Sequence, residues 1–306
     1  MVMKLNSVAI LKPIVKWFMK KAGFRPQTIE IEPGTIMHFW VPIETSNIKH
    51  KPCVVFIHGF AFTGILTWTF QALSLAKNYA VYVPDLIFFG ESTSDRPDRL
   101  PEFQAECVAK GLMKLGVENC TLVGFSYGGT LVFKIADMYP NMVDSMIISS
   151  STIAFTESIS KAALERVGFS SWSDYLLPSN VKEAKLTFDI ATYKLPPIPN
   201  FLWKDILEIM SENRKEKKEL LEALVVSDKD YSIPRNYPQK LHLLWGEHDR
   251  IFTVEVANNI KKQLGENVEV HCIEKAGHLL QLERPFTYNK HLHKILASFM
   301  DDDKEK

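Results

Sequence analysis

Residues Cys120 to Pro140 read CTLVGFSYGGTLVFKIADMYP, and this stretch decides the fold. A short β-like run is followed by apolar residues at helical spacing that end at Pro140. Between them, GFSYGG (124–129) places a glycine two residues before and two residues after Ser126. The pattern predicts a strand, a sharp turn and a helix, with the serine hydroxyl raised into a cleft and helix amides facing any negative charge that develops there. A glycine-rich turn that contains a serine without a catalytic role would have the same sequence pattern. Assigning Ser126 as a nucleophile therefore requires a base, an acid and a second oxyanion donor elsewhere in the chain.

The composition of the chain limits its possible domain organisation and its possible classes of partner. The 306 residues are 46% hydrophobic, which is enough for one large core or for one domain with an insertion. Lys and Arg together number 36, as do Asp and Glu, so the overall charge gives no support for nucleic-acid binding. No apolar run approaches about 18 residues, so we expect no membrane span. No secretory signal pattern appears either.

The four cysteines show neither a paired C-x-x-C motif nor a metal-ligand spacing. They are Cys53, Cys107, Cys120 and Cys272, and three of them fall in apolar strand-like runs. We therefore expect free, buried cysteines and a cytoplasmic, reducing location. No metal or other cofactor is predicted.

Strand-like and helical patterns alternate along most of the chain. A hairpin is expected at 27–31 and 35–41, then strands at 53–57, 79–83, 120–123, 143–149, 241–245 and 268–273, with helices at 68–78, 101–115 and 287–298. This alternation predicts a mostly parallel α/β sheet flanked by helices and joined by right-handed crossovers. Residues 152–233 carry helical patterns without a convincing strand, which predicts a helical cap inserted after the sixth strand.

Residues 1–25 contain six cations and no acid, interleaved with apolar side chains. A basic amphipathic helix of this kind could lie on an anionic membrane surface. The alternative is a helix that packs its apolar side on the domain or roofs the cleft. Pro13 interrupts the amphipathic pattern, which favours the packed helix and leaves peripheral membrane contact as the second interpretation.

A serine nucleophile needs a base and an acid, and both follow late strands. The strand at 241–245 ends in Gly246-Glu247-His248-Asp249, and the strand at 268–273 is followed by a small turn and His278. Carboxyl ends of parallel strands meet at one edge, so these groups should converge on Ser126. His278 is the predicted base. Asp249 is preferred over Glu247 as the acid because it lies further into the loop.

The predicted oxyanion donors are the backbone amides of Phe60 and Tyr127. Phe60 ends His58-Gly59-Phe60, which follows the strand at 53–57, and Tyr127 follows the serine directly. Gly59 lets the backbone approach a reacting carbonyl, and His58 is expected to orient this loop. Losing one such donor costs ~2.7–4 kcal/mol of activation free energy.

These motifs together resemble the α/β-hydrolase fold, in particular the monoacylglycerol lipase and esterase type and its epoxide-hydrolase-related plant branch. The resemblance rests on the motifs HGF (58–60), PDL (84–86), GFSYGG (124–129), WGEHD (245–249) and AGHLLQLERP (276–285). The resemblance covers about residues 28–298. It implies an α/β-hydrolase core at 26–151 and 236–300 with a helical cap at 152–235, while the residues themselves indicate a basic amphipathic N-terminal helix at 1–25 and a polar tail at 301–306. It also implies Ser126, Asp249 and His278 as a catalytic triad.

Two departures from the family pattern fall near the expected substrate entrance. Ala61 stands where glycine is common, followed by Phe62, and Phe88 and Phe89 stand in a row after PDL. Phe62, Phe88 and Phe125 are therefore predicted to line an apolar substrate pocket, although each could also be ordinary core.

The sequence thus predicts a serine esterase or lipase-like enzyme that cleaves small or medium apolar acyl esters, as a monomer or dimer. An epoxide hydrolase or dehalogenase is disfavoured, because those chemistries need a carboxylate where Ser126 stands. Two alternatives stay open. One is a ligand receptor that retains the triad, and the other is a lyase or decarboxylase of specialised metabolism.

Overall fold

A single sheet of nine strands forms the centre of the computed structural model, which describes residues 8–43, 48–195, 197–232 and 237–302. The strand order is β1-β2-β4-β3-β6-β7-β8-β9, with β5 paired to β2. The strands β3 to β9 other than β5 run parallel, and the β1–β2 hairpin is antiparallel. The strand bounds are β1 Phe24–Glu32, β2 Thr35–Pro42, β3 Cys53–Ile57, β4 Ala80–Pro84, β5 Thr93–Ser94, β6 Cys120–Phe125, β7 Val143–Ser149, β8 Lys240–Gly246 and β9 Val268–Ile273.

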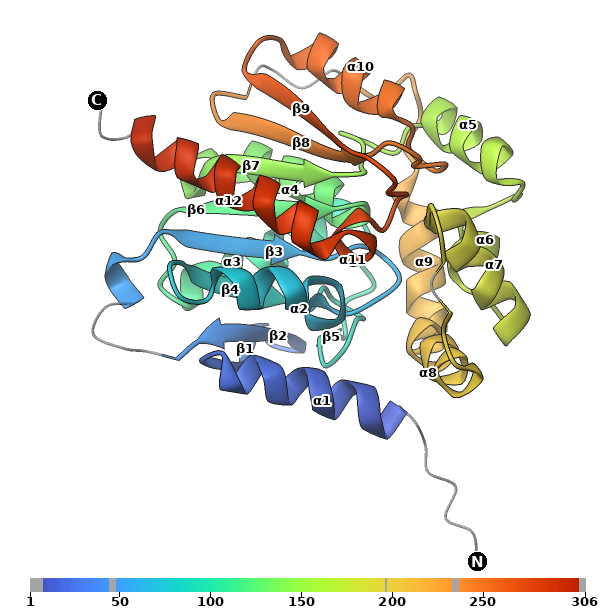
Figure 1. Cartoon of the computed structure of the whole chain (residues 1–306), viewed down its shortest axis with the longest axis horizontal. Coiled ribbons are helices and arrows are strands. Elements are labelled where there is room, and N and C mark those ends of the chain that lie inside the picture. The colour runs from blue at the N-terminus through green and yellow to red at the C-terminus, as the bar shows by residue number, and fades with distance from the viewer. Residues whose placement is uncertain (1–7, 44–47, 196, 233–236, 303–306) are drawn as a thin grey trace, which may run out of the picture.

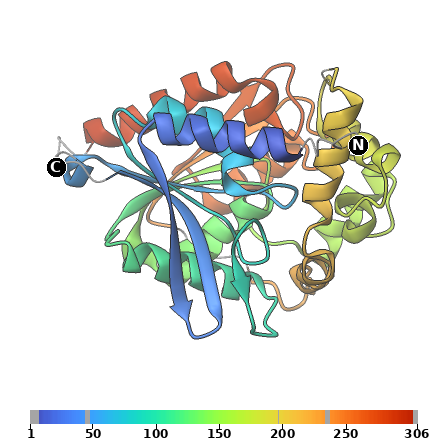
Figure 2. The same cartoon turned by 90° about the horizontal axis from the view of Figure 1, so that it is seen from below.

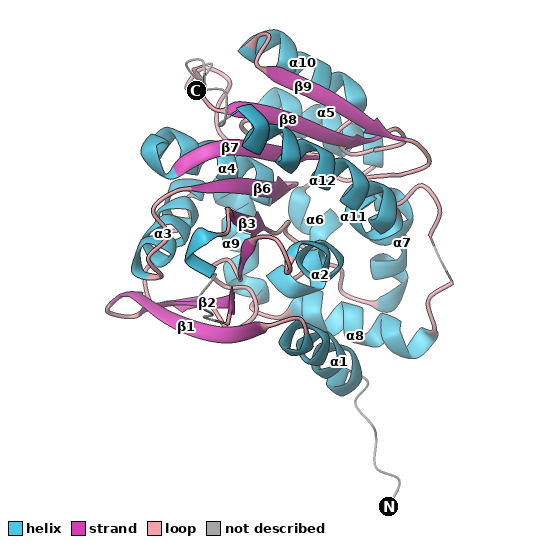
Figure 3. Cartoon of the chain, turned by 60° about the vertical axis from the view of Figure 1, so that its left-hand side comes forward, coloured by secondary structure: helices cyan, strands magenta, loops and turns pink. Residues whose placement is uncertain are grey.

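Helices cover both faces of this sheet (Figures 1 and 3). Helices α2 and α12 pack together on one face, and α3 and α4 pack together on the other. Core helices have the bounds α1 Val8–Lys21, α2 Gly64–Leu75, α3 Pro101–Lys114, α4 Tyr127–Met138, α10 Val254–Leu264, α11 Leu280–Glu283 and α12 Pro285–Asp302, with short 3₁₀ turns at Ile48–His50 and Pro140–Met142. The strands buried between these layers are continuous apolar runs, as expected for a parallel sheet.

Between β7 and β8, the described residues form an insertion of five helices, called here the helical insertion. They are α5 Glu157–Val167, α6 Trp172–Leu176, α7 Val181–Ala191, α8 Asn200–Ser211 and α9 Arg214–Leu224. The insertion gathers beyond the carboxyl ends of the central strands, as Figure 2 shows from a second direction. It follows the sixth strand of the chain if the two-residue strand β5 is left out of the count. The predicted boundary at 235–236 lies outside the described residues.

Helix α1 packs on the domain. It contacts α2, α8 and β1, and Met19 is fully buried. Lys12 forms an ion pair with Glu212 of the insertion at 2.7 Å, and Lys16 pairs with Glu91 at 2.9 Å. Its outer face leaves Trp17 exposed. The packed helix is therefore observed over residues 8–21, and membrane contact through its outer face stays a prediction.

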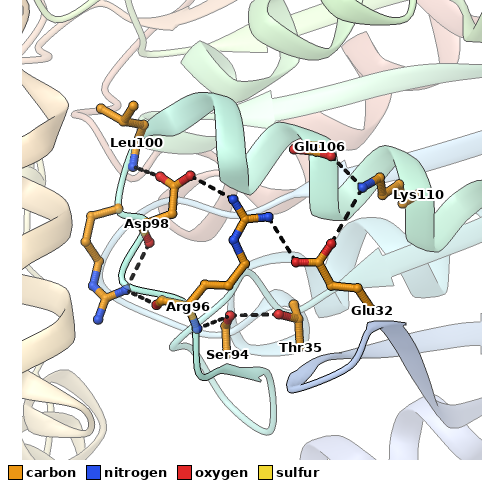
Figure 4. A network of polar contacts seen from close by, with 9 residues as sticks. Glu32, Thr35, Ser94, Arg96, Asp98, Leu100, Glu106 and Lys110 are labelled. Atoms are coloured by element: carbon orange, nitrogen blue, oxygen red, sulfur yellow. Dashed lines mark hydrogen bonds and ion pairs between the residues drawn. The ribbon is translucent and has the colours of Figure 1, made fainter.

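A polar network ties the β1–β2 hairpin to the segment that leads into α3 (Figure 4). Arg96 donates to Glu32 at 2.9 Å and pairs with Asp98 at 3.3 Å, while Lys110 lies 3.8 Å from the other oxygen of Glu32. Arg96 also stacks its guanidinium over the Phe103 ring, at 4.6 Å. This network anchors an edge of the sheet remote from the Ser126 turn.

The predicted fold class is confirmed, and the strands expected at 53–57, 143–149 and 268–273 have those bounds. Helix α2 begins four residues earlier than predicted, and β5 was missed because two residues leave no periodicity. All four cysteines are free, but Cys272 is exposed rather than buried. Its strand β9 is the edge of the sheet, so an apolar run there does not imply burial on both faces. Helix α12 extends to Asp302, so it includes the start of the predicted tail.

Candidate active site

Ser126 lies in a strained turn between β6 and α4. Its φ angle is 52°, a left-handed value that is rare outside glycine. The flanking glycines permit this turn sterically. A Cβ at Gly128 would lie 2.4 Å from the carbonyl oxygens of both Ile57 and His58, and one at Gly124 would lie 2.7 Å from the Gly128 oxygen. The G-x-S-x-G pattern is therefore required by close backbone packing between the turn and the end of β3.

The three residues predicted as a triad lie in one hydrogen-bonded chain. His278 Nε2 is 3.0 Å from Ser126 Oγ, and His278 Nδ1 is 2.9 Å from Asp249 Oδ2. The carboxylate accepts a hydrogen bond from the Nδ1–H group, and this tautomer turns the lone pair of Nε2 toward the serine hydroxyl. The ring of His278 is held between the rings of Phe125 and Phe252, at 4.9 and 5.8 Å.

Asp249, and not Glu247, faces His278. Its other oxygen accepts hydrogen bonds from the amides of Ile251 and Phe252, at 2.8 and 3.0 Å, and its side chain is fully buried. Glu247 is half exposed and lies 3.4 Å from the exposed ring of His248. Backbone donors to a buried carboxylate stabilise its charged form, which suits an acceptor for a histidine proton.

His58 orients the loop that carries the amide of Phe60. Burial lowers the pKa of His58 to about 4, so the ring is neutral near pH 7. Its Nε2 accepts a hydrogen bond from the Leu86 amide at 2.9 Å, so Nδ1 carries the proton and donates to the Gly59 carbonyl at 2.7 Å. Holding the Gly59 carbonyl in this way fixes the peptide that presents the Phe60 N–H.

The amides of Phe60 and Tyr127 therefore come from two loops in direct contact. Tyr127 is the first residue of α4, where an amide has no partner inside the helix, and its ring packs edge-on against Phe60 at 5.7 Å. The turn at Gly128 touches the carbonyl of His58. The assignment of these two amides as oxyanion donors stays a prediction.

An apolar cavity of about 50 Å³ lies beside Ser126 and His278. The core contributes Phe62 and Phe125, together with Ala61, to its walls. The helical insertion supplies the facing wall, which includes Trp172, Phe188, Ala191, Leu221 and Leu224. Sequence reasoning missed these insertion residues, because helical periodicity identifies an apolar face without identifying what that face covers.

Phe88 does not line this cavity, so its predicted role in substrate binding is wrong for this structure. Its backbone has a φ of 71°, and its ring packs under the Arg99 guanidinium at 4.4 Å. Its carbonyl accepts a hydrogen bond from Asn213 of the insertion at 3.0 Å. The neighbouring Phe89 packs against His58 and Phe60, at 5.1 and 5.2 Å. Phe89 therefore supports the loop at His58–Phe60 from behind, and Phe88 packs away from the cavity.

Hydrogen bonds across the cavity fix the insertion to the core. Arg250 donates to the carbonyls of Asp189 and Ile190 at the end of α7, and Arg166 donates to the Ile251 carbonyl at 2.8 Å. The Leu279 amide, next to His278, donates to the Ala191 carbonyl at 3.1 Å. The loops that carry Asp249 and His278 are therefore both tied to the insertion.

Comparisons with known proteins agree with this architecture. The frog (Xenopus tropicalis) protein named epoxide hydrolase 3 is 26% identical over 84% of this chain and 74% of its own. Human monoacylglycerol lipase ABHD6 is 24% identical over 84% of this chain and 79% of its own. The crystal structure of a bacterial membrane phospholipase A superimposes with a TM-score of 0.80 at 22% identity, over 96% of this chain and 91% of that one.

The plant branch of the resemblance stays a prediction. In the part of the chain that the structure describes, no helix has the length and apolar character to cross a bilayer. The family model for the alpha/beta hydrolase fold matches residues 52–285, from the start of β3 to the start of α12. The chain therefore belongs to the α/β-hydrolase fold family.

Proposed function

We propose that this protein is a serine hydrolase that cleaves carboxylic esters with small or medium apolar acyl groups through an acyl-enzyme. The observation that carries this proposal is the unbroken chain from Ser126 Oγ through His278 to Asp249, at 3.0 and 2.9 Å, beside an apolar cavity. A hydroxyl within hydrogen-bond distance of an oriented, neutral imidazole is an activated nucleophile.

In the proposed mechanism, Ser126 Oγ attacks the ester carbonyl while His278 Nε2 takes its proton. Asp249 stabilises the imidazolium, and the amides of Phe60 and Tyr127 stabilise the oxyanion. His278 then protonates the departing alcohol. Water, activated by the same histidine, attacks the acyl-enzyme and releases the acid.

The walls of the cavity support an apolar acyl group as the part of the substrate that it holds. Aromatic and aliphatic side chains from the core and the insertion surround it, which suits an apolar acyl chain. The name of the human relative, a monoacylglycerol lipase, also favours an ester substrate. Epoxide opening is disfavoured, because a neutral serine replaces the carboxylate nucleophile that this chemistry needs.

Labelling with a fluorophosphonate probe tests the nucleophile, and an ester panel of graded acyl length tests turnover. We expect the unaltered protein to be labelled and to turn over short or medium esters, and Ser126→Ala to lose both properties. Absence of labelling in the folded, unaltered protein would exclude Ser126 as an activated nucleophile. Labelling without multiple turnover on any ester would instead favour the receptor or the lyase.

A further inference from the structure

A second group of chemically active side chains lies on the sheet, away from Ser126. His242 on β8 and His271 on β9 approach each other, with Nδ1 and Nε2 2.9 Å apart. Glu269 Oε2 lies 3.8 Å from the first nitrogen and 3.7 Å from the second. Strand register brings them together, because His242 pairs with Glu269 and Leu244 pairs with His271. Alternating side chains then place all three on one face of the sheet.

The spacing of these three atoms fits a tetrahedral metal ion. Ligand atoms at about 2.0–2.1 Å from zinc lie roughly 3.4 Å from one another in a tetrahedral site. The observed separations of 2.9, 3.7 and 3.8 Å bracket that value. The two imidazole planes are nearly parallel, 10° apart, and the facing nitrogens form a hydrogen bond when no ion is bound, so both rings must rotate for their lone pairs to point at one ion. Three ligands would leave the fourth position to water.

Helix α12 covers both histidine rings. The ring of His242 is almost fully buried and packs against Phe299 of α12, at 5.1 Å. His271 is mostly buried and lies against His291, also on α12, at 5.9 Å. Two imidazole nitrogens and one carboxylate oxygen are donor atoms of the kinds that zinc takes in proteins. Each ring can hold its single proton on the nitrogen that faces away from the other ring, which frees both facing nitrogens as ligands.

We propose that His242, Glu269 and His271 bind one zinc-class divalent ion that links β8 to the edge strand β9. We assign this site a structural role, because its three ligands lie within the strands, two to four residues before their carboxyl ends. The same two strands lead to Asp249 and to His278, so the ion would hold together the two strands that carry the acid and the base. The sequence predicts no metal, since His242 and Glu269 lie far apart along the chain and only the register joins them.

Cobalt(II) titration of the full chain, purified without a histidine tag, tests this site directly. We expect one Co²⁺ per chain, with the visible absorption of a tetrahedral ion, and displacement of that ion by Zn²⁺. His271→Asn should abolish the tetrahedral spectrum. Glu269→Gln, an exposed and conservative change, should weaken binding roughly tenfold or more while leaving the fold intact.

The matched control is His50→Asn, which removes an exposed histidine from the 3₁₀ turn at Ile48–His50. It should bind Co²⁺ like the unaltered protein. Zn²⁺ should raise the Tm of the unaltered protein and of His50→Asn, but not that of His271→Asn. Absence of a stoichiometric tetrahedral spectrum in the unaltered protein would overturn the proposal. So would a spectrum that persists in both Glu269→Gln and His271→Asn. Neither result bears on Ser126, so the proposed hydrolase function is tested separately.

Discussion

At the scale of single residues, the site depends on how buried polar groups are paired. Asp249 has each carboxylate oxygen satisfied, one by His278 and the other by two backbone amides. His58 has both ring nitrogens satisfied, one by a backbone amide and the other by a carbonyl. Such fully paired groups fix tautomers as well as positions, and both residues can be tested on that basis.

Asp249→Asn should lower kcat for ester hydrolysis by about 10³–10⁴, because an amide facing Nδ1 favours the wrong tautomer of His278. The matched control is Glu247→Gln, two residues away and half exposed, which should keep kcat within about threefold. Steady-state kinetics on one ester would decide between them. A larger loss in Glu247→Gln than in Asp249→Asn would show that the acid is misassigned.

The buried ring of His58 makes stability depend on pH. Its pKa is about 4 in the folded chain against 6.5 for an unperturbed histidine, so the unfolded state takes up the proton first as the pH falls. This contribution is fully present above pH 6.5 and is lost between pH 6.5 and 4, up to about 3 kcal/mol.

Urea unfolding at pH 7 and at pH 5 measures this effect of His58. The variant His58→Gln keeps an amide that can donate and accept, and it should lose less stability than the unaltered protein between these two pH values. The exposed His50→Gln should behave like the unaltered protein. Equal losses in the unaltered protein and in His58→Gln would contradict a neutral, buried His58.

At the scale of elements, the strand–turn–helix at 120–138 was predictable because several independent requirements coincide there. Gly124 and Gly128 have no room for a Cβ, and Ser126 alone adopts the strained angle between them. Continuous apolar runs likewise identified the parallel strands. The pattern could not show that Phe88 packs outside the cavity, because its contact with Arg99 is a tertiary one that no local pattern encodes.

Gly128→Ala tests the steric requirement in this element. The added Cβ would meet two carbonyl oxygens at 2.4 Å, so we expect a loss of about 3 kcal/mol in the free energy of unfolding and loss of fluorophosphonate labelling. Gly168→Ala is a control with open space around it and a φ of +78°, so only backbone strain of about 1 kcal/mol applies. Unchanged labelling in Gly128→Ala would contradict the close contact between the turn and β3.

Helix α1 offers a second test at this scale, because its two faces differ. Met19→Ala should cost about 2–5 kcal/mol of stability, since this side chain is fully buried. Trp17→Ser should cost less than about 0.5 kcal/mol, because Trp17 is 54% exposed. Urea unfolding measures both costs.

Sedimentation with anionic vesicles tests whether the outer face of α1 contacts a membrane. If it does, Trp17→Ser should bind the vesicles less than the unaltered protein.

At the scale of the whole molecule, the substrate cavity belongs to neither the core nor the insertion alone. The core motifs could be predicted from the sequence because chemistry demands particular residues at particular spacings. The residues of the insertion are not constrained in this way, since any apolar side chains of suitable size can form the wall of the cavity. The side chains of Arg166, Arg250 and Asn213 join the insertion to the core by donating to backbone carbonyls. Every residue has such a carbonyl, so the sequence does not show which one accepts the hydrogen bond. Acyl length is therefore the property that sequence alone predicts least well.

Leu221→Ala should shift substrate preference toward longer acyl chains. Leu221 lies on α9, lines the cavity and is 3% exposed, so removing its branched end enlarges the space beside Ser126 without touching the proposed triad. We expect the ratio of kcat/KM for a longer ester to that for a short ester to rise about tenfold. The variant should also lose about 2–5 kcal/mol of stability, so kinetics belong at a temperature where it remains folded.

The matched control is Leu186→Ala, which makes the same chemical change on α7, where the side chain is 48% exposed and outside the cavity. It should leave the acyl preference unchanged. A parallel fall in kcat/KM for every ester in Leu221→Ala would mean that this wall does not contact the acyl group. A shift of equal size in Leu186→Ala would mean that the insertion governs preference through its movement, because a surface residue cannot alter the cavity volume.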